Sequence, residues 1–234
     1  MKFRLVVADP PWSFSDKLTM SDVKRSADSQ YKTLSISDIG KLDVESLVHD
    51  DAVLALWVPS SMLTEGIAVM RAWGFEPKQT HIWVKTKKEA LSGLVKKAVS
   101  IIEILRTSRI DQNSRKILSF LNDLAKHDPK DDLAFGMGRL FRQTHEIVLI
   151  GTRGKIYKHL KDKSQRSVHF HPVTKHSEKP EALQDMLDKM FGGKVKKLEL
   201  FARRDRPGWT CVGLECPSTI DEDIHDSIKR LLAG

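Results

Sequence analysis

Residues 5–14 read LVVADPPWSF, and this stretch decides the fold that the sequence predicts. An uninterrupted apolar run such as 5–7 is typical of a strand buried on both faces, as in a parallel sheet. Asp9 follows at once, where a carboxylate is costly unless it is paired or lies in a cleft. Pro10 and Pro11 lack the N–H groups that would continue a hydrogen-bonded ladder. The stretch therefore indicates either a rigid strand end or a site at the carboxyl end of a strand, where open α/β sheets bind ligands.

Apolar strands and amphipathic helices alternate along the rest of the chain. The expected strands are 51–59, 77–86, 144–154, 195–202 and 209–215, and the expected helices are 35–48, 61–75, 177–193 and 218–234. Ser37 and Ser177 are the expected N-caps of two of these helices, and Thr219 with Glu222 forms a capping-box pattern at the start of the last. Strands and helices joined by short links predict an α/β fold with a mostly parallel sheet, right-handed crossovers and helices on both faces.

Residues 88–135 interrupt this alternation. Two segments with helical spacing of apolar residues predict a helical hairpin inserted into a single domain that spans residues 1–234. The hairpin carries Lys96, Lys97, Arg106 and Arg109 among its basic residues. Two interpretations stay open: a solvated polar face on two packed helices, and an insertion that binds nucleic acid.

The charge and cysteine content narrow the class of protein. The 234 residues carry a formal net charge of +8, which favours a polyanionic partner, nucleic acid first. A basic enzyme with no such partner stays open as an equal alternative. Two cysteines spaced C-x4-C argue against a zinc ribbon and a disulfide framework. We expect no membrane span, no signal peptide and a cytoplasmic location. His169, His171 and His176 lack carboxylates at ligand spacing, so we expect no metal.

Asp9 to Trp12 combine the groups that an amino-group methyltransferase needs in one place. The exocyclic amine of adenine is a poor nucleophile because its lone pair is delocalised into the ring. The Asp9 carboxylate and the Pro10 carbonyl can each accept one amine hydrogen, which favours the pyramidal geometry that frees the lone pair. Trp12 offers a stacking face for a base, worth about 1–3 kcal/mol. In a duplex the base must first be extruded.

These residues, with the motifs that follow them, resemble the DPPW-type adenine N(6)-methyltransferases, the family of the catalytic subunit of the mRNA adenosine methyltransferase and of bacterial and phage enzymes. The motifs in the family's order are YKTLS, LALWVP, HIWVKT, GMGRLFRQTHEIVLIGTRG, HSEKPE, LELFARR and GWTCVGLE. The resemblance covers most of residues 3–215 apart from the helical insertion. It implies a Rossmann-like fold, S-adenosylmethionine as methyl donor and adenine in a nucleic acid as acceptor.

The resemblance also implies roles for particular side chains. Lys179 at a helix start would pair with the cofactor's carboxylate, Arg203 would bind the ribose, and Phe201 would pack on adenine or on the cofactor. The residues implied for the cofactor are Asp9, Lys179, Phe201, Arg203 and Glu215, and those implied for the substrate are Trp12, Tyr31, Lys85, Arg142, His145 and Glu146. Lys179 as a surface lysine, Phe201 as a core residue, Arg203 as a solvated residue and Tyr31 as a loop anchor remain open alternatives.

One stretch departs from the family's pattern. Where relatives commonly have Gly-Asn-Glu or Gly-Asn-Gln, this chain has Gly213-Leu214-Glu215. The asparagine's contact with the cofactor is therefore missing, while Glu215 could still hold ribose hydroxyls. The affinity for the cofactor is the property that this change puts in question.

Three functions are compatible with these residues. The first is methylation of adenine N(6) in DNA, in a bacterial or phage-infected cell, which we favour because there is no recognisable RNA-binding module. The second is methylation of adenosine in RNA with the same residues. The third is a non-catalytic nucleic-acid-binding subunit, against which the intact Asp-Pro-Pro-Trp sequence counts. A homodimer is left open.

Overall fold

The structure is a computed structural model that describes residues 2–13, 33–88, 101, 117, 119, 128–136, 138, 140–174 and 178–234. Most of the predicted helical insertion over 88–135 lies outside the described residues, as do Tyr31, His176 and Ser177. Two compact units make up the chain. The first unit consists of Met1–Ile82, Glu146–Val168 and Glu181–Gly234, and the second unit of Trp83–His145 and His169–Pro180. The single domain over 1–234 stays a prediction.

The described strands form one seven-stranded sheet in the order β5-β3-β4-β2-β1-β6-β7. Their bounds are β1 Phe3–Ala8, β2 Val48–Val58, β3 Glu76–Thr86, β4 His145–Arg153, β5 Val168–Pro172, β6 Lys197–Leu200 and β7 Thr210–Val212. β1 pairs in parallel with β2 and with β6, and β6 pairs in parallel with β7. β4 runs antiparallel to β2. The sheet is therefore mostly parallel, as the sequence predicts, and the antiparallel β4 makes it mixed.

Five α-helices are described. Their bounds are α1 Ile36–Gly40, α2 Val44–Leu47, α3 Leu63–Ala72, α6 Ala182–Phe191 and α7 Ile224–Ala233. Single 3-10 turns occupy Ser60–Met62, Pro129–Asp132, Ile156–His159 and Pro217–Thr219. Within the described part of the chain, no helix is both long and apolar enough to cross a membrane.

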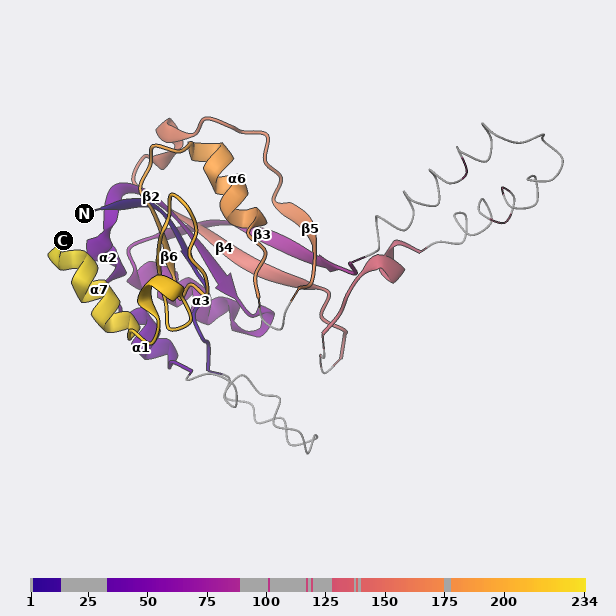
Figure 1. The fold of residues 1–234 in the computed structure, drawn as a ribbon, viewed down its shortest axis with the longest axis horizontal. Coiled ribbons are helices and arrows are strands. Elements are labelled where there is room, and N and C mark those ends of the chain that lie inside the picture. The colour runs from indigo at the N-terminus through magenta and orange to yellow at the C-terminus, as the bar shows by residue number, and fades with distance from the viewer. Residues whose placement is uncertain are drawn as a thin grey trace. The chain divides into compact units, whose positions relative to one another are not determined.

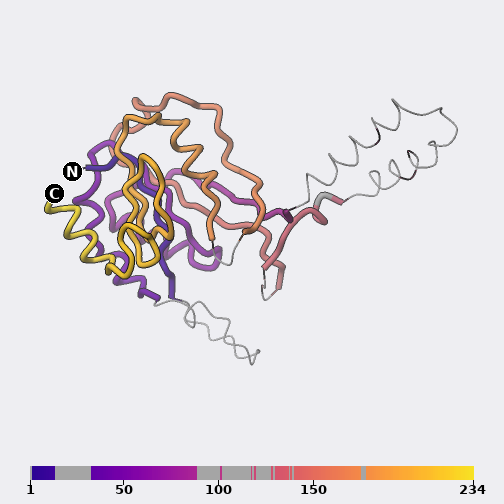
Figure 2. Tube along the Cα trace, viewed as in Figure 1, coloured from indigo at the N-terminus to yellow at the C-terminus, as the bar shows by residue number. Residues whose placement is uncertain are grey.

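Along the central strands, successive side chains alternate between two apolar layers, one on each face of the sheet. β1 is therefore buried on both faces. Val6 and Ala8 join a core with residues of α1, α2, α3 and α7. Val53, on β2, lines the same pocket as Leu183 of α6, on the other face of the sheet. Helices therefore cover both faces of the sheet (Figure 1). The last helix, α7, contacts α2, and Figure 2 shows the path of the chain to it. This arrangement confirms the predicted Rossmann-like fold class.

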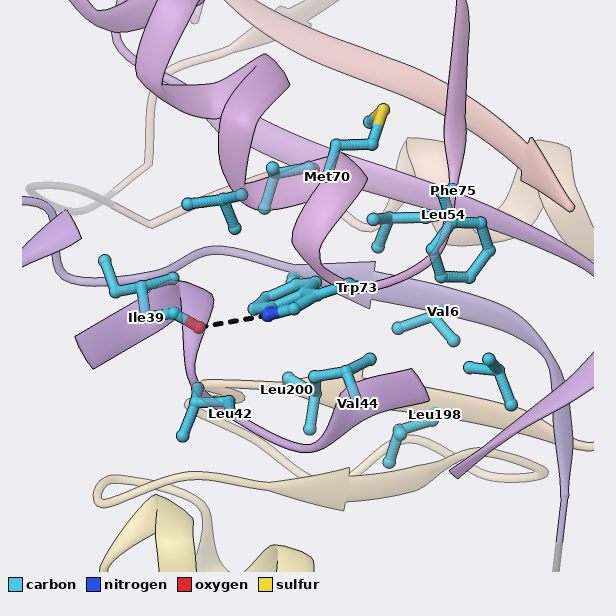
Figure 3. Close-up of a cluster of buried hydrophobic side chains, with 14 of the residues drawn as sticks. Val6, Ile39, Leu42, Val44, Leu54, Met70, Trp73, Phe75, Leu198 and Leu200 are labelled. Atoms are coloured by element: carbon cyan, nitrogen blue, oxygen red, sulfur yellow. Dashed lines mark hydrogen bonds between the residues drawn. The ribbon is translucent and has the colours of Figure 1, made fainter. Parts of the chain in front are cut away.

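Trp73 closes the core between α1 and α3. Its side chain is fully buried, and its indole N–H donates to the carbonyl of Ile39 at 3.0 Å, as Figure 3 shows. Met70, Val44 and Leu200 surround it in the same cluster. Because a buried indole N–H needs a partner, this bond fixes the end of α3 against α1.

Several element boundaries differ from those predicted. Ser35, not Ser37, caps the first helix, and Asp43 starts a second helix where one was expected over 35–48. The last helix begins after Asp223, whose side chain accepts from the N–H of His225. The hydroxyl of Thr219 instead bonds the backbone of Gly213. In each case the residue just before the first turn supplies the capping side chain. Thr219 does not cap the last helix, because its hydroxyl is bound to Gly213.

The sheet order also differs from a simple alternation of strands and crossovers. β4 lies between β2 and β3 and runs antiparallel to β2. β5 was not predicted: its sequence VHFHP alternates apolar and polar residues, but the run is short and ends in proline. In the second unit, the indole N–H of Trp83 on β3 donates to the carbonyl of His171 on β5 at 2.9 Å.

We predict that Trp73→Phe lowers the free energy of unfolding by about 1–3 kcal/mol, because it removes the indole hydrogen bond and leaves a void. Urea unfolding followed by circular dichroism measures the change. Tyr157→Phe, at an exposed aromatic residue, is the control and should stay within about 0.5 kcal/mol of the wild type. Equal stability of the Trp73 variant and the wild type would contradict the role of the bond.

Candidate active site

The carboxyl ends of four strands meet at one edge of the sheet in the first unit. β1, β2, β6 and β7 are parallel neighbours, so the residues that follow them lie at the same edge. Asp9 follows β1, Phe201 follows β6, and Gly213 follows β7. Three of the predicted motifs therefore converge on this edge.

Asp9 starts a short turn that continues the line of β1. Its N–H donates to the carbonyl of Leu200 on β6 at 3.4 Å, which extends the parallel ladder by one step. The carbonyl of Pro10 accepts from the N–H of Trp12 at 2.9 Å, and the carbonyl of Pro11 accepts from the N–H of Leu34 at 3.0 Å. A carbonyl oxygen has two lone pairs, so the bond from Trp12 orients the Pro10 carbonyl and leaves it chemically able to accept a second hydrogen.

Trp12 anchors this turn to the sheet. The side chain is 5% exposed and belongs to the core, and its indole N–H donates to the carbonyl of Trp57 on β2 at 2.9 Å. A buried and hydrogen-bonded indole has the properties of a structural anchor. We therefore expect Trp12 to hold Asp9 and Pro10 in place. The predicted stacking of Trp12 on a base stays a prediction.

The chain leaves β6 through a strained turn. Phe201 has a φ of 61°, a left-handed conformation that costs a non-glycine residue about 1–3 kcal/mol. The next residue, Ala202, donates its N–H to the carbonyl of Val212 at 2.9 Å. A Cβ atom on Gly213 would lie 2.3 Å from the carbonyl oxygen of Ala202, so only glycine fits there. The close approach of these two strand ends fixes where the residues after them begin.

Arg203 and Glu215 form an ion pair beyond these strand ends. The Arg203 Nε lies 3.8 Å from the Glu215 Oε1, and both side chains are partly exposed. Phe201 is half-buried and packs against the core. The pair offers a donor and an acceptor side by side, which is the combination that vicinal ribose hydroxyls require.

A charged network ties the loop after β6 to α6, and sequence analysis did not identify it. The Arg206 side chain is 12% exposed and contacts Glu181, Asp185 at 2.6 Å and Asp188 at 3.2 Å. Arg204 also pairs with Glu181, at 2.7 Å. Because α6 is itself buried against the sheet, the network holds the segment that carries Arg203. Carboxylates spaced three or four residues apart on α6, at positions 181, 185 and 188, were the available signal.

Lys197, on β6, is also part of this network. Its Nζ lies 2.6 Å from Asp188 Oδ1, and its side chain is almost fully buried. Although burial raises the pKa of Asp188, hydrogen bonds from Lys197, Trp209 and Arg206 hold it below its ordinary value overall. Asp188 is therefore a charged member of the network at neutral pH.

Glu199 is a second carboxylate near Asp9. In the register of β1 and β6, Glu199 lies opposite Val7, two residues before Asp9, so the two carboxylates share one face of the sheet. Burial raises the pKa of Glu199, a hydrogen bond from Gln184 and the charge of Arg204 oppose this shift, and the charge of Asp9 adds to it. Sequence analysis did not identify Glu199, for which the acidic residue inside LELF was the available signal.

Both cysteines are buried free thiols. Burial, with the charge of Glu199 beside it, raises the pKa of Cys211 to about 12. A protonated thiol is neither a nucleophile nor a metal ligand, so Cys211 is a packing residue. Among the described residues there is no group of three or more His, Cys, Asp or Glu side chains that could hold a metal ion.

Three predicted substrate residues lie in the second unit. Lys85, on β3, places its Nζ 5.4 Å from the centre of the Trp83 ring. Arg142 is exposed and lies over the Phe135 ring at 5.8 Å, and His145 begins β4. Glu146 is the next residue along β4 and belongs to the first unit. Each role for these residues stays a prediction.

Lys179 is a half-buried residue of the second unit, three positions before α6 begins. α6 ends at Gly192, which has a φ of 76°, as the glycine in the sequence predicts. Lys179 and α6 belong to different units. The predicted pairing of Lys179 with a carboxylate stays a prediction.

The sheet and the Asp-Pro-Pro-Trp turn at the end of β1 define the Rossmann-like methyltransferase class. Within this class, the chain belongs to the MT-A70 family, which it matches over residues 3–105 and 115–215. It is 27% identical over 230 residues to the Type II methyltransferase M.MunI of a Mycoplasma species, covering 92% of this chain and 78% of that protein.

Two eukaryotic relatives are similar over shorter parts of their own length. The human N(6)-adenosine-methyltransferase catalytic subunit METTL3 is 25% identical over 233 residues, which cover 98% of this chain and 31% of that protein. The N(6)-adenosine-methyltransferase non-catalytic subunit METTL14 of Xenopus tropicalis is 25% identical over 186 residues, which cover 75% of this chain and 32% of that protein. The similarity thus extends to a catalytic and to a non-catalytic subunit.

We predict that Trp12→Phe lowers methyl-transfer turnover at least about tenfold, because loss of the indole bond to Trp57 lets Asp9 move from its position. Initial rates at saturating cofactor measure the effect, and the melting temperature shows that the variant is folded. Phenylalanine stacks on bases almost as well as tryptophan. Retention of most activity in Trp12→Phe, with loss in Trp12→Ala, would therefore favour stacking over anchoring.

We predict that Arg206→Gln lowers the free energy of unfolding by about 2–4 kcal/mol, because three carboxylates on α6 lose their shared cation. Since Asp188 has a lowered pKa, the network stabilises the fold above the ordinary pKa of aspartate. That contribution is lost as the pH falls through the lowered value, so the difference from the wild type should shrink in acid. Urea unfolding at several pH values measures it.

The matched control for this prediction is Lys229→Gln. Lys229 pairs with Asp226 on the exposed face of α7, and its side chain is 76% exposed. A surface pair of this kind contributes little, so the change should stay within about 0.5 kcal/mol. A pH-independent loss in Arg206→Gln would contradict the electrostatic account.

Proposed function

We propose that this chain transfers a methyl group from S-adenosylmethionine to the N(6) amine of adenine in DNA. The observation that carries the proposal is the Asp9–Trp12 turn, which is intact in sequence and anchored at the carboxyl end of a central parallel strand. The reaction needs acceptors for the amine hydrogens and a fixed geometry, and the turn supplies both.

Asp9 and the Pro10 carbonyl would act on the acceptor amine. The Asp9 carboxylate accepts one amine hydrogen and the Pro10 carbonyl the other, so the nitrogen lone pair turns out of conjugation with the ring. Pro10 is buried, its ring fixes φ, and the following Pro11 restricts ψ, so the carbonyl is kept pointing in one direction. The main contribution of these groups is therefore orientation, with hydrogen bonds that strengthen as positive charge develops on the nitrogen.

The residues at the strand ends fit S-adenosylmethionine by their donor set. The partly exposed Arg203–Glu215 pair supplies a donor and an acceptor for ribose hydroxyls, and Phe201 an apolar face for the adenine ring. Lys179 would hold the carboxylate of the methionine part. When bound, the cofactor supplies an electrophilic methyl group on a sulfonium. The Asp9 carboxylate suits the positive charge that this group carries.

The choice of DNA is supported by the Mycoplasma relative, whose name is that of a Type II methyltransferase and whose length this chain covers to 78%. The human relative favours RNA as a second candidate, because its similarity extends over 98% of this chain. Both substrates present the same adenine edge to the same acceptor groups. The alternative of a non-catalytic subunit is supported by similarity to the METTL14 subunit and by Leu214, which stands where relatives commonly have asparagine.

We predict that Asp9→Asn lowers methyl-transfer turnover by about 100- to 10,000-fold, because an amide offers one weaker acceptor where a carboxylate offers two. Transfer of labelled methyl to DNA measures turnover, and calorimetry measures cofactor binding. Asp50→Asn, at an exposed residue of β2, is the matched control and should leave turnover within about twofold. Unchanged turnover in Asp9→Asn would exclude the proposed mechanism.

A further inference from the structure

Glu199 and Gln184 form a polar pair on the face of the sheet that α6 covers. Gln184, on α6, is 2% exposed, and its side-chain amide donates a hydrogen bond to the carboxylate of Glu199 on β6. Glu199 itself is half-buried. Moving a carboxylate out of water costs free energy, and an apolar residue would fill the same place without that cost. Packing alone therefore does not account for the pair.

One hydrogen-bond acceptor of this pair is unused. The Oε1 atom of Gln184 is buried and has no hydrogen-bond partner within the described part of the chain. A buried acceptor without a partner costs about 1–3 kcal/mol. Rotation of the amide by half a turn exchanges its oxygen and its nitrogen, so Gln184 can donate to a carboxylate or accept from a carboxylic acid. The pair can therefore hold Glu199 with or without a proton.

Asp9 is the acidic neighbour of this pair on the adjacent strand end. Glu199 lies opposite Val7 in the parallel register of β1 and β6, so Asp9 is its diagonal neighbour on the same face. Two neighbouring carboxylates bind a first proton more readily than either would alone, because sharing it removes their mutual repulsion. Asp9 and Glu199 are therefore suited to act together as one proton acceptor.

The other groups that face Glu199 lie on β7, on α6 and in the loop after β6. Burial is the largest influence and raises the pKa of Glu199, and the charge of Asp9 adds to it, while the bond from Gln184 and the charges of the two arginines oppose it. These arginines, Arg204 and Arg206, are already paired with carboxylates at the start of α6. Cys211, opposite Glu199 on β7, is a neutral thiol. The surroundings of Glu199 therefore favour uptake of a proton.

We propose that Asp9 and Glu199 act as a pair that accepts the proton released by methyl transfer. This role rests on the proposed function and adds a destination for the proton. The nitrogen lone pair forms the bond to the methyl carbon, while the carbon–sulfur bond breaks and its electron pair stays on sulfur. The nitrogen, now positively charged, loses one proton to the Asp9 carboxylate, and the proton passes from there to Glu199. Glu199 acts through Asp9 and is therefore a positioning residue for the proton.

The first test is the pH dependence of the chemical step. Single-turnover transfer of labelled methyl to unmethylated plasmid DNA is measured from about pH 5 to about pH 9. In the wild type the rate should fall in acid, because a pair that already holds a proton cannot accept another. Glu199→Gln should lower the rate at neutral pH at least about fivefold and move this acid limb to lower pH, because Asp9 loses a negative neighbour.

Gln184→Met gives a prediction of the opposite sign. Methionine is similar in size but donates no hydrogen bond, so the pKa of Glu199 rises further and the acid limb should move to higher pH. The matched control is Glu45→Gln. Glu45 is a carboxylate on α2 that pairs with Arg153 at 3.2 Å and is 56% exposed, and its loss should leave the rate and the acid limb unchanged.

A second measurement uses the free chain and needs no cofactor. Because the fold raises the pKa of Glu199, ionisation of this residue costs stability as the pH rises from the ordinary glutamate value through the raised one. The wild type should therefore lose free energy of unfolding relative to Glu199→Gln over this range. Urea unfolding of both proteins at several pH values measures the difference.

Three results would each overturn the inference and leave the proposed function standing. They are an acid limb that stays in place in Glu199→Gln, limbs that move in the same direction in Glu199→Gln and Gln184→Met, and a stability difference that does not depend on pH. A lower rate with an unmoved limb would make Glu199 a structural residue only. A wild type that transfers no label to DNA at any pH would contradict the proposed function itself, and the inference with it.

Discussion

The hydrogen bond from the indole of Trp12 to the carbonyl of Trp57 is the constraint on which the candidate site depends. It joins the turn after β1 to the neighbouring strand β2, at 2.9 Å and away from solvent. Without it, two prolines would leave the chain after β1 with few backbone hydrogen bonds to hold its path. With it, Asp9 and the carbonyl of Pro10 have fixed positions at the carboxyl end of the strand. Fixed acceptors are what the proposed activation of an amine requires.

The other strand ends reach the same edge by different means. The turn after β6 accepts a left-handed Phe201, and the strand after it packs so closely that Gly213 has no room for a side chain. Arg206 then binds three carboxylates of α6. The strained residue and the ion network both lie in the segment that follows β6. The cofactor residues proposed here lie in the same segment and at the end of β7.

The sequence predicted the parts that depend on local pattern. The apolar run before Asp9, the glycine that ends α6 and the mostly parallel sheet follow from hydrophobic spacing and turn residues. It did not predict β5, or β4 as an antiparallel strand beside β2, because strand order is set by long-range pairing. Nor did it show that Trp12 is buried, since the partner of its indole is 45 residues away. The contacts of Arg206 and Glu199 could not be predicted either, because their partners also lie far away in the sequence.

The most direct measurement of the central claim is transfer of labelled methyl from S-adenosylmethionine to double-stranded DNA, single-stranded DNA and RNA, followed by nucleoside analysis of each product. The account predicts label in DNA, all of it in N(6)-methyladenine, and none in RNA. Label in RNA alone would move the activity to the second candidate. Label on another base, or no label with any substrate although the cofactor binds, would contradict the role given to Asp9 and the Pro10 carbonyl.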